Sequence, residues 1–461
     1  MKIYNTLSRS IEEFIPQNPP QVSMYSCGPT VYDYQHIGHM RRYVGDDVLI
    51  RVLQSNGYTV HHVMNITDVG HLVSDSDTGE DKMEKGSKKF GKSVWEVAKM
   101  FENQFKDSCR LLNIVLPHGD NLMHATDYIK EQIELVETLE EKGYTYKLED
   151  GIYFDTSKFP DYFKLSRQNP EELKKGARVE FIEGKKNAAD FALWKFSPKG
   201  EKRQMEWDSP WGIGFPGWHI ECSAMSMKAL GRTLDIHTGG IDHIAIHHTN
   251  EIAQSECATG VQFVRYWVHH NFLVVNGTKM SKSLGNFYTV EDVKAKGYDP
   301  LSLRYLYLQT HYRQEMNFTW EALEGAQKAY KKLVEEIASW DAPAVGCAEY
   351  EERFMTAVND DMNMSKALSI VWELVKSDYP TSAKAESMKR FDEILGLQLF
   401  EKAKEKEKAV EVPEEVQKLL AERETFRKSE DWVASDELRK KIESLGFAVA
   451  DSKEGSKVVR K

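Results

Sequence analysis

The stretch VSMYSCGPTVYDYQHIGHMRRYVGDDVLIRVLQSNGYTVHHVMNI, residues 22–66, decides the fold of this chain. Residues 22–26 predict a short strand. Apolar residues then recur at helical spacing over 44–53, and an Asn-Gly pair at 56–57 is a common helix terminator. Residues 58–66 predict a second strand. Strand, helix and strand in this order favour a parallel α/β sheet of the nucleotide-binding kind.

The remainder of the chain predicts an insertion and two further units. Residues 119–212 mix a helix, strand pairs and loops, which indicates an insertion into the α/β domain. From 300 to 400 the pattern is helical and predicts a bundle. The charged stretch 401–415 contains Pro413 and predicts a helical spacer or linker. Beyond it we expect a small mixed α/β domain with two amphipathic helices and a strand, at 416–420, 432–445 and 447–450.

Composition excludes several classes of protein. Hydrophobic residues make up 41% of the 461 residues, which rules out a mainly disordered chain. No apolar run approaches the ~18 residues that a membrane helix needs, and no signal-peptide stretch opens the sequence. The five scattered cysteines exclude a disulfide scaffold and indicate a reducing cytoplasm. The net charge of −11 does not by itself indicate a nucleic-acid binder, so any RNA contact has to rest on local patches.

One candidate motif is the tetrad His36-Ile37-Gly38-His39, at the predicted junction of the first loop and helix. Two imidazoles one turn apart at a helix start can approach one anion together, and the helix N-terminus favours a phosphate. Gly38 has no Cβ, so a flat ring can pack against its backbone. Taken alone, the tetrad is equally compatible with a helix cap that has only a structural or metal-binding role.

A second candidate motif is the loop Lys279-Met280-Ser281-Lys282-Ser283. Two lysines three residues apart in a loop of small residues can bracket a polyphosphate as point charges. By itself, the same sequence also suits an ordinary solvated loop.

Four side chains form a candidate metal site. Cys27 follows the first predicted strand, Cys222 lies in GWHIECSAM, and His247 and Glu251 lie four residues apart on one helix face. Thiolates, an imidazole and a carboxylate suit zinc. Without the other motifs, a purely structural zinc site or simply buried cysteines explain these residues as well.

Taken together and in this order, the two motifs resemble the two signatures of the class I aminoacyl-tRNA synthetases. YSCGPTVYDYQHIGHMR, DFALWK, GWHIECSAM, MSKSLGNF and the Gly-Gly-Ile-Asp ending at Asp242 resemble the cysteinyl-tRNA synthetases, over nearly the full length. The resemblance implies a Rossmann-type domain that activates L-cysteine with ATP and Mg²⁺ to cysteinyl-adenylate and releases pyrophosphate. Cysteine then passes to the 3′ end of tRNA(Cys). It also implies a cytoplasmic monomer with one Zn²⁺ that takes the substrate thiolate, the group that distinguishes cysteine from serine.

The resemblance also assigns roles to individual residues. It assigns catalysis to His36, His39, Lys279 and Lys282. ATP binding falls to the same four together with Gly38, Met280 and Ser281. The cysteine pocket falls to Thr67, Trp218, His237 and Asp242. Zinc falls to Cys27, Cys222, His247 and Glu251.

The pocket assignments have ordinary alternatives. Asp242 is suited to holding the substrate ammonium, and His237 and Trp218 to closing over the small side chain. Trp218 is equally explained as a core residue, and His237 as a buried histidine with satisfied hydrogen bonds.

The chain departs from the family pattern near the expected metal site. Thr249 stands where an acidic residue is usual, and His243 begins a stretch that replaces a more usual L-x-F-P. The loop 69–83 is longer than usual and contains His71. His71 and His243 complicate the zinc shell, and we expect neither to be a ligand.

Two other classes of protein share part of this pattern. The cysteine ligase of mycothiol synthesis joins cysteine to an amino sugar at the same kind of ATP and zinc site, but it lacks a tRNA-reading tail. A non-catalytic RNA-binding paralogue would not need intact signatures.

Beyond Trp432 the tail has seven basic and five acidic residues, which suits anticodon contacts. On helical spacing we expect Trp432 itself to lie in the core.

The residue patterns and the resemblance together divide the chain into seven segments. The catalytic domain has two halves, separated by a connective insertion. The expected boundaries are 1–118 and 213–268 for these halves, 119–212 for the insertion, 269–318 for the KMSKS loop and stem-contact region, 319–400 for the helical bundle, 401–413 for the linker and 414–461 for the anticodon-binding domain.

Overall fold

The computed structural model describes residues 1–69, 81–169, 184–198, 200, 202–409, 413–429, 431–452 and 455–460. It contains two units, Met1–Tyr330 with Pro343–Leu397 and Lys331–Ala342 with Gln398–Lys461. Most of the variant loop at 69–83, with His71, lies outside the described residues, as do Lys453 and Lys461 of the tail. Among the helices of the described part, none is long and apolar enough to cross a membrane.

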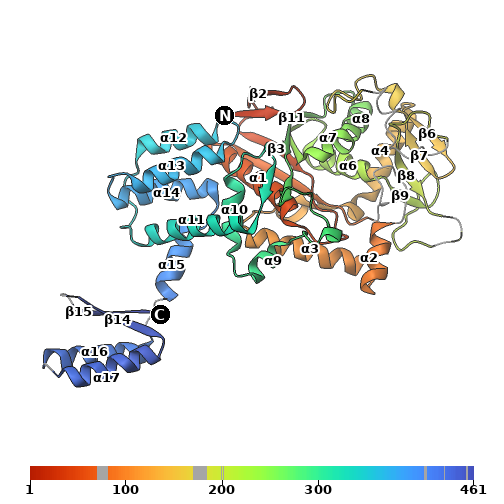
Figure 1. Cartoon of the computed structure of the whole chain (residues 1–461). Helices are drawn as coiled ribbons and strands as arrows, with labels where there is room; N and C mark the ends of the chain where they lie inside the picture. Colours follow the sequence, from red (N-terminus) through yellow and green to blue (C-terminus); the bar gives the residue numbers. More distant parts are fainter. Residues whose placement is uncertain are drawn as a thin grey trace. The chain divides into compact units, whose positions relative to one another are not determined.

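A five-stranded parallel sheet forms the centre of the first unit (Figure 1). Its spatial order is β11-β10-β3-β4-β5, so the strand that comes first in the sequence lies in the middle. Tyr25 of β3 pairs with His237 on one side and with Val63 on the other. The strands are β3 (Gln21–Ser26), β4 (Thr59–Ile66), β5 (Leu122–His124), β10 (Leu234–Gly240) and β11 (Val264–His270).

Alternate side chains of the sheet build two cores. Val22 and Met24 face a core that contains residues of α1, whereas Tyr25 and Val63 face a core that contains residues of α6 and α8. Because successive side chains of a strand point to opposite faces, each face of the sheet acquires its own helical layer. The helices are α1 (Ile37–Ser55), α6 (Trp218–Leu230) and α8 (His247–Thr259).

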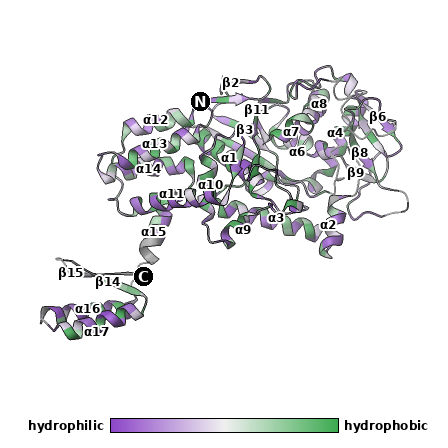
Figure 2. Ribbon diagram, in the orientation of Figure 1, coloured by the Kyte–Doolittle hydropathy of each residue, from purple (hydrophilic) through white to green (hydrophobic). Residues whose placement is uncertain are grey.

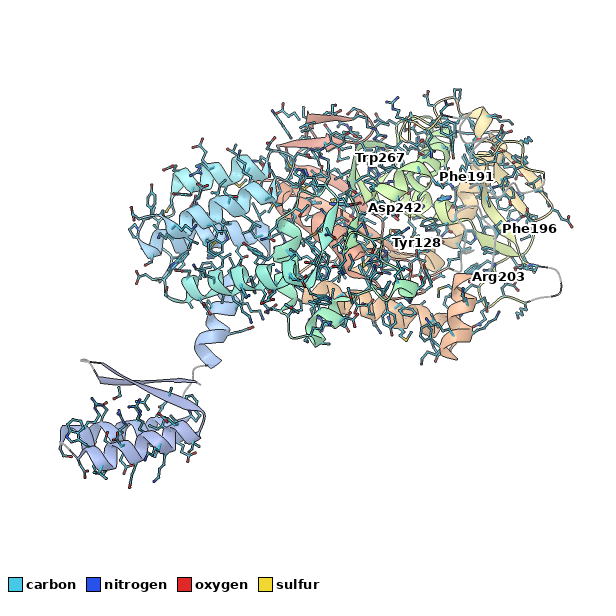
Figure 3. The ribbon with its side chains drawn as sticks, viewed as in Figure 1. Tyr128, Phe191, Phe196, Arg203, Asp242 and Trp267 are labelled. Carbon is cyan, nitrogen blue, oxygen red and sulfur yellow. The ribbon has the colours of Figure 1, made fainter. Side chains whose placement is uncertain are left out.

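An antiparallel sheet of four strands lies between β5 and α6 in the sequence, in the order β6-β7-β8-β9. Figure 3 labels Phe191, Phe196 and Arg203 in this part of the first unit. The Arg203 guanidinium lies 3.5 Å from the ring centroid of Phe215 and forms an ion pair with Asp81, the N-cap of α2. The elements are α4 (Ile129–Glu141), β6 (Thr145–Leu148), β7 (Gly151–Phe154), β8 (Phe191–Phe196) and β9 (Gly214–Pro216).

Shorter strands and further helices complete the first unit. The two pairs of short strands are β1 (Lys2–Asn5) with β2 (Ser10–Glu13) and β12 (Leu273–Val275) with β13 (Met316–Phe318). The helices are α2 (Lys82–Phe90), α3 (Val94–Leu111), α7 (Ile241–Ala245), α9 (Val290–Ala295), α10 (Pro300–Leu308), α12 (Ala348–Val358), α13 (Met364–Lys376) and α14 (Thr381–Leu395). Helix α11 (Trp320–Ala338) has residues in both units.

The second unit contains a helical pair and a hairpin. Its small core consists of Val416, Ile442, Phe447 and Val449. Hydrophobic and hydrophilic residues alternate along α16 and α17, as expected for helices that each bury one face (Figure 2). The elements are α15 (Leu399–Ala409), α16 (Glu414–Lys428), α17 (Trp432–Ser444), β14 (Phe447–Ser452) and β15 (Gly455–Arg460).

The fold class is confirmed: a Rossmann-type parallel sheet with an insertion, followed by helices and a small mixed α/β part. Within the stretch 401–413, the residues up to Ala409 are helical. The helix predicted at 416–420 extends over all of α16, and the strand predicted at 447–450 is the first strand of a hairpin.

The expectation for Trp432 is wrong. Its side chain is 57% exposed, whereas Leu438 and Ile442 further along α17 are buried. Trp432 is the first residue of the helix, immediately after the N-cap Asp431, and the Arg427 guanidinium lies 6.0 Å from its ring centroid. Helical spacing alone does not reveal that a first-turn residue lies beyond the core.

Candidate active site

The candidate site lies at the carboxyl ends of β3 and β10, where the order of the strands reverses. Cys27 directly follows β3, and Asp242 lies in α7, directly after β10. Figure 3 places the labelled Asp242 and Trp267 in the central part of the first unit. Parallel pairing of the two strands thus brings segments that are far apart in the sequence to one edge of the sheet.

His36 is the N-cap of α1. Its Nδ1 accepts hydrogen bonds from the backbone N–H groups of Gly38 at 3.1 Å and His39 at 3.2 Å, so the neutral ring carries its proton on Nε2. Burial lowers the pKa of His36 to about 4. His39 stacks on His36 with ring centroids 3.5 Å apart. At neutral pH, His36 therefore offers an N–H donor and not a positive charge.

The loop of residues 279–283 packs directly on the start of α1. The Cε atom of Met280 lies 2.6 Å from the position that a Cβ on Gly38 would take. Asn286 holds the loop in shape, because its side chain accepts from the Ser281 N–H at 2.8 Å and donates to the Lys279 carbonyl at 3.2 Å. The two sequence motifs are therefore in contact.

Lys282 is tied to the segment that precedes α1. Its ammonium forms an ion pair with Asp33 and lies 5.0 Å from the ring centroid of Phe287. Lys279 and Lys282 are both exposed. Both lysines are thus available to a polyphosphate at the start of α1, once Lys282 exchanges its carboxylate partner for a phosphate.

The four predicted metal ligands come together. Cys27, Cys222, His247 and Glu251 each place one donor atom within 4.8 Å of those of the other three. All four residues are between 0% and 3% exposed. Cys222 is supplied by α6, while His247 and Glu251 occupy successive turns of α8.

The Glu251 carboxylate indicates that this cluster fits a cation. Its Oε1 lies 3.0 Å from His247 Nε2, yet no donor among the described residues is oriented to hydrogen-bond with it. Its Oε2 accepts a hydrogen bond from His237 Nε2 at 2.8 Å. A buried carboxylate oxygen without a donor is costly unless a cation completes its surroundings. Two sulfurs, one nitrogen and one oxygen form a donor set typical of zinc.

A second combination of donors shares two of these residues. Cys27, His237, His248 and Glu251 are also close enough to hold an ion. However, His237 Nε2 lies 2.8 Å from Glu251 Oε2, and His248 Nε2 lies 3.2 Å from Cys27 Sγ. These are hydrogen-bond distances, which suit residues that orient the ligands. The first set differs in offering two sulfurs, a donor pair typical of zinc.

The two thiols of the cluster differ in acidity. Burial opposes ionisation of Cys27, but a hydrogen bond from Cys222 and the nearby His248 lower its pKa well below the usual range. The same hydrogen bond raises the pKa of Cys222 well above its usual range. Burial opposes protonation of His247, but Glu251 and Cys27 raise its pKa to about 10. A metal that binds here has to displace protons from Cys222 and His247.

The residues predicted for the cysteine pocket occupy three different settings. Thr67 is buried and donates to Glu221 Oε2 at 3.0 Å. The indole of Trp218 packs on the ring of His247, with centroids 4.4 Å apart. Asp242 is exposed on the first turn of α7. Their contact with a substrate stays a prediction.

His237 occupies the most enclosed of these positions. It is fully buried and stacks on Trp267, with ring centroids 4.7 Å apart. Its Nε2 donates to Glu251, so it lies against the metal ligands. This setting suits a residue that orients the carboxylate.

The structure accounts for one departure from the family pattern. The Thr249 hydroxyl donates to the Ile244 carbonyl at 2.8 Å and so ties α8 to α7. His243 belongs to neither donor combination found among the described residues. Its buried Nδ1 has no hydrogen-bond partner in that part of the chain, and its ring centroid lies 5.0 Å from that of His248.

Three histidines around the cluster were not predicted. His219 Nδ1 lies 2.8 Å from His247 Nδ1, and His248 contacts both Cys27 and His269. His269 shares a face of β11 with Trp267, two residues earlier. The sequence signal was the dense occurrence of histidine on α8 and β11, which no single motif singles out. Asp33 and Asn286 were not predicted as functional residues either, because no motif assigns them a role.

Two family models match most of the chain, and curated relatives match nearly all of it. The family described as "tRNA synthetases class I (C) catalytic domain" matches residues 13–328, and "Cysteinyl-tRNA ligase anticodon binding domain" matches residues 409–458. A cysteine–tRNA ligase 1 of Burkholderia lata is 48% identical, with 99% of this chain and 96% of the relative covered. A cysteine–tRNA ligase of Treponema denticola is 44% identical, with 98% of both chains covered.

Solved structures show the same fold at low sequence identity. A Mycobacterium tuberculosis methionyl-tRNA synthetase in complex with methionyl-adenylate has a TM-score of 0.56 and 15% identity, covering 83% of this chain and 91% of that one. The LeuRS–tRNA–LeuAMS complex of Agrobacterium radiobacter has a TM-score of 0.58 and 12% identity, covering 85% of each chain. On the matches to both family models and the full-length relatives, the chain belongs to the cysteine–tRNA ligase family of class I tRNA synthetases.

Proposed function

We infer that this protein is a cysteine–tRNA ligase, an ATP-dependent class I enzyme that acts on cysteine, ATP and tRNA. The observation that supports this most is the position of the four metal-type donors. They lie at the sheet's switch point, in a chain whose two nucleotide motifs also meet there. Membership of the family supplies the activity, and the cluster supplies a reason for the choice of amino acid.

The first step is attack of the cysteine carboxylate on the α-phosphate of ATP, with pyrophosphate leaving. His36 donates from Nε2 to a phosphate oxygen, because its Nδ1 is occupied by backbone N–H groups. His39, stacked on it, assists. Lys279 and Lys282 balance the charge that develops on the departing pyrophosphate, together with Mg²⁺ that enters with ATP. Gly38, Met280 and Ser281 form the surface on which the nucleotide lies.

Cys27, Cys222, His247 and Glu251 would hold one Zn²⁺. When bound, zinc would supply a soft Lewis acid that prefers a thiolate to a hydroxyl. A pocket that selected its substrate by shape alone would discriminate poorly between cysteine and serine, because the two amino acids differ by one atom. Around the cluster, Trp218 and Thr67 close the pocket, and Asp242 holds the substrate ammonium. His237 contributes by orienting Glu251.

The second step transfers cysteine from the adenylate to a hydroxyl at the 3′ end of tRNA(Cys), with AMP leaving. The second unit, where the anticodon-domain family matches, is the proposed anticodon reader. We propose a monomer that acts in the cytoplasm, where a reducing environment suits the five free, buried cysteines. The seven segments expected from the sequence, such as 119–212 for the insertion, remain part of this proposal.

ATP–pyrophosphate exchange with each of the twenty amino acids tests the assignment. Cysteine alone should support exchange, and serine is the sharpest control because it is nearly isosteric. Purified tRNA(Cys) should then be charged at its 3′ end. Exchange with a different amino acid would refute the assignment, as would cysteine-dependent exchange in an enzyme that ligates an amino sugar and leaves tRNA uncharged.

A further inference from the structure

A row of hydrogen bonds runs from Cys27 through two histidines to Thr6. His248 Nε2 lies 3.2 Å from Cys27 Sγ, and its Nδ1 lies 2.7 Å from His269 Nε2. His269 Nδ1 lies 2.8 Å from Thr6 Oγ1. All four residues are at most 4% exposed. They come from α8, β11 and the residues just after β3 and β1, so only the folded sheet aligns them.

The surroundings of His248 Nε2 fix where this ring carries its proton. The atom faces Cys27 Sγ at 3.2 Å and Glu251 Oε1 at 3.9 Å. Both of these accept hydrogen bonds and donate none when Cys27 is a thiolate. A lone pair on Nε2 would be repelled by both, so Nε2 carries the proton.

The proton positions of the other groups in the row follow from that of His248. Nδ1 of a neutral His248 is then an acceptor, so His269 donates to it from Nε2. His269 Nδ1 becomes an acceptor in turn, and the Thr6 hydroxyl is the group that donates to it. Every hydrogen bond therefore points from Thr6 toward the sulfur.

Burial keeps both imidazoles neutral. His248 is fully buried and His269 is 4% exposed. The titratable groups around His269 include His248 at 2.7 Å, together with His237, His243, His270 and Cys27, and none of the described carboxylates forms an ion pair with it. Placing a positive charge among other imidazoles in the interior is costly.

We propose that Thr6 and His269 are positioning residues for the metal site: through His248 they direct an N–H···S hydrogen bond onto the sulfur of Cys27. This rests on the proposed function, because it takes Cys27 as a metal ligand. A hydrogen bond that draws charge from one thiolate leaves the metal more able to accept a further sulfur, that of the substrate. A hydroxyl three residues away along the row thus influences how tightly cysteine is held.

The test replaces Thr6 by valine, which keeps the shape and removes only the hydroxyl. The full chain is loaded with Co²⁺ in place of Zn²⁺, and its affinity and thiolate-to-cobalt charge-transfer band are measured. We expect Thr6→Val to weaken metal binding about tenfold, the lower end of the effect of ligand-orienting residues. The band should shift, and the KM for cysteine should rise more than kcat falls. Thr6→Ser, which restores the hydroxyl, should return all three to wild-type values.

A matched control is Thr156→Val. Thr156 is a buried threonine of the insertion whose hydroxyl donates to Asp190 at 2.7 Å, and its substitution should leave the cobalt band unchanged. If Thr6→Val matches wild type in both band and metal affinity, the proposed relay is wrong.

Histidine-selective ¹⁵N NMR of the metal-free wild type supplies a readout that does not depend on metal. His248 and His269 should both carry their protons on Nε2. A proton on Nδ1 of His269 would overturn the assigned direction. Failure of the wild type to bind either metal would instead overturn the proposed metal site, so the two failures are distinct.

Discussion

Met280 occupies the space above Gly38. Its Cε lies 2.6 Å from where a Cβ on Gly38 would be, and His36 Cε1 lies 3.0 Å from the same point. A methyl group at position 38 can therefore be added only if the Met280 side chain or the His36 ring moves. The contact couples the loop that carries the two lysines to the histidine that caps α1.

We expect Gly38→Ala to slow cysteine-dependent pyrophosphate exchange by up to about 10²-fold, because small displacements of reacting groups cost that much. The double variant Gly38→Ala with Met280→Ala should recover part of the loss. Gly325→Ala is the control, since a Cβ there meets nothing within 4 Å and α11 only gains helix propensity. Equal rates for Gly38→Ala and Gly325→Ala would show that the contact is unimportant.

Lys282→Ala should lower kcat by about 10²–10³-fold, the usual effect of removing one charge-stabilising donor, with a smaller change in the KM for ATP. Lys282 pairs with Asp33 on a partly exposed surface, so the free energy of unfolding should hardly change. Lys328→Ala, which removes another exposed lysine paired with a carboxylate, should leave the rate intact. A Lys282→Ala enzyme within twofold of wild type contradicts the assigned role.

Cys222→Ser should abolish stoichiometric zinc, because it removes one of two sulfur donors and leaves the other three unable to complete the site. Metal analysis of the purified protein measures this directly. Cys109→Ser is the matched control, since Cys109 is equally buried but belongs to neither donor combination found in the described residues. Full zinc content in Cys222→Ser would remove this residue from the set of ligands.

The pair His124–Glu102 should make stability depend on pH. Their side chains lie 3.1 Å apart; the hydrogen bond raises the pKa of His124, and with Lys106 it lowers the pKa of Glu102 to about 2. The histidine's contribution is complete below ~6.5 and is lost as pH rises through its higher folded pKa. The carboxylate's contribution is complete above ~4.3 and is lost as pH falls toward its folded pKa.

Glu102→Gln should therefore destabilise the protein most between those limits, by about 1 kcal/mol once solvent screening of this pair is counted. Urea unfolding across the pH range measures the difference from wild type. Asp107→Asn, which breaks an exposed ion pair on the same helix, should show little pH dependence. A difference that stays flat with pH would mean that the pair is not ionised as described.

Trp432→Ala should reduce tRNA charging and leave pyrophosphate exchange unchanged. Stacking of an aromatic side chain on an unpaired base is worth about 1–3 kcal/mol, and the side chain is 57% exposed, so stability should change little. Trp95→Ala removes an exposed tryptophan of the first unit and should charge normally. If both variants charge equally well, Trp432 does not contact tRNA.

The elements that could be predicted are those whose signal lies within a short stretch. Residues 22–66 carry alternation, helical spacing and a terminating Asn-Gly, and the strand, helix and strand lie there. The four metal-type donors could be predicted because the spacing of His247 and Glu251 on one helix face is local. Their convergence with Cys27 and Cys222 required the family pattern.

What could not be predicted depends on neighbours supplied by the fold. Thr6, His248 and His269 meet only because β1, α8 and β11 are adjacent in space, and no local pattern marks Thr6. Trp432 fits the helical stripe of α17, yet the end of the helix leaves it exposed. In the same way, Lys282 forms its ion pair with Asp33 only because the fold brings the loop of residues 279–283 to the segment before α1.

The four donors are far apart in the sequence, and this affects when the metal site can form during synthesis on the ribosome. Cys27 is synthesised early, but Glu251 emerges only after the whole insertion has been made. At ~5–20 residues per second, the thiol of Cys27 waits roughly 10–45 s for its last partner. For most of that interval the nascent chain holds Cys27 without Cys222, His247 or Glu251, so the four-donor site is incomplete. The complete metal site can therefore form only late in synthesis. A protein with bound metal has already joined both halves of the sheet.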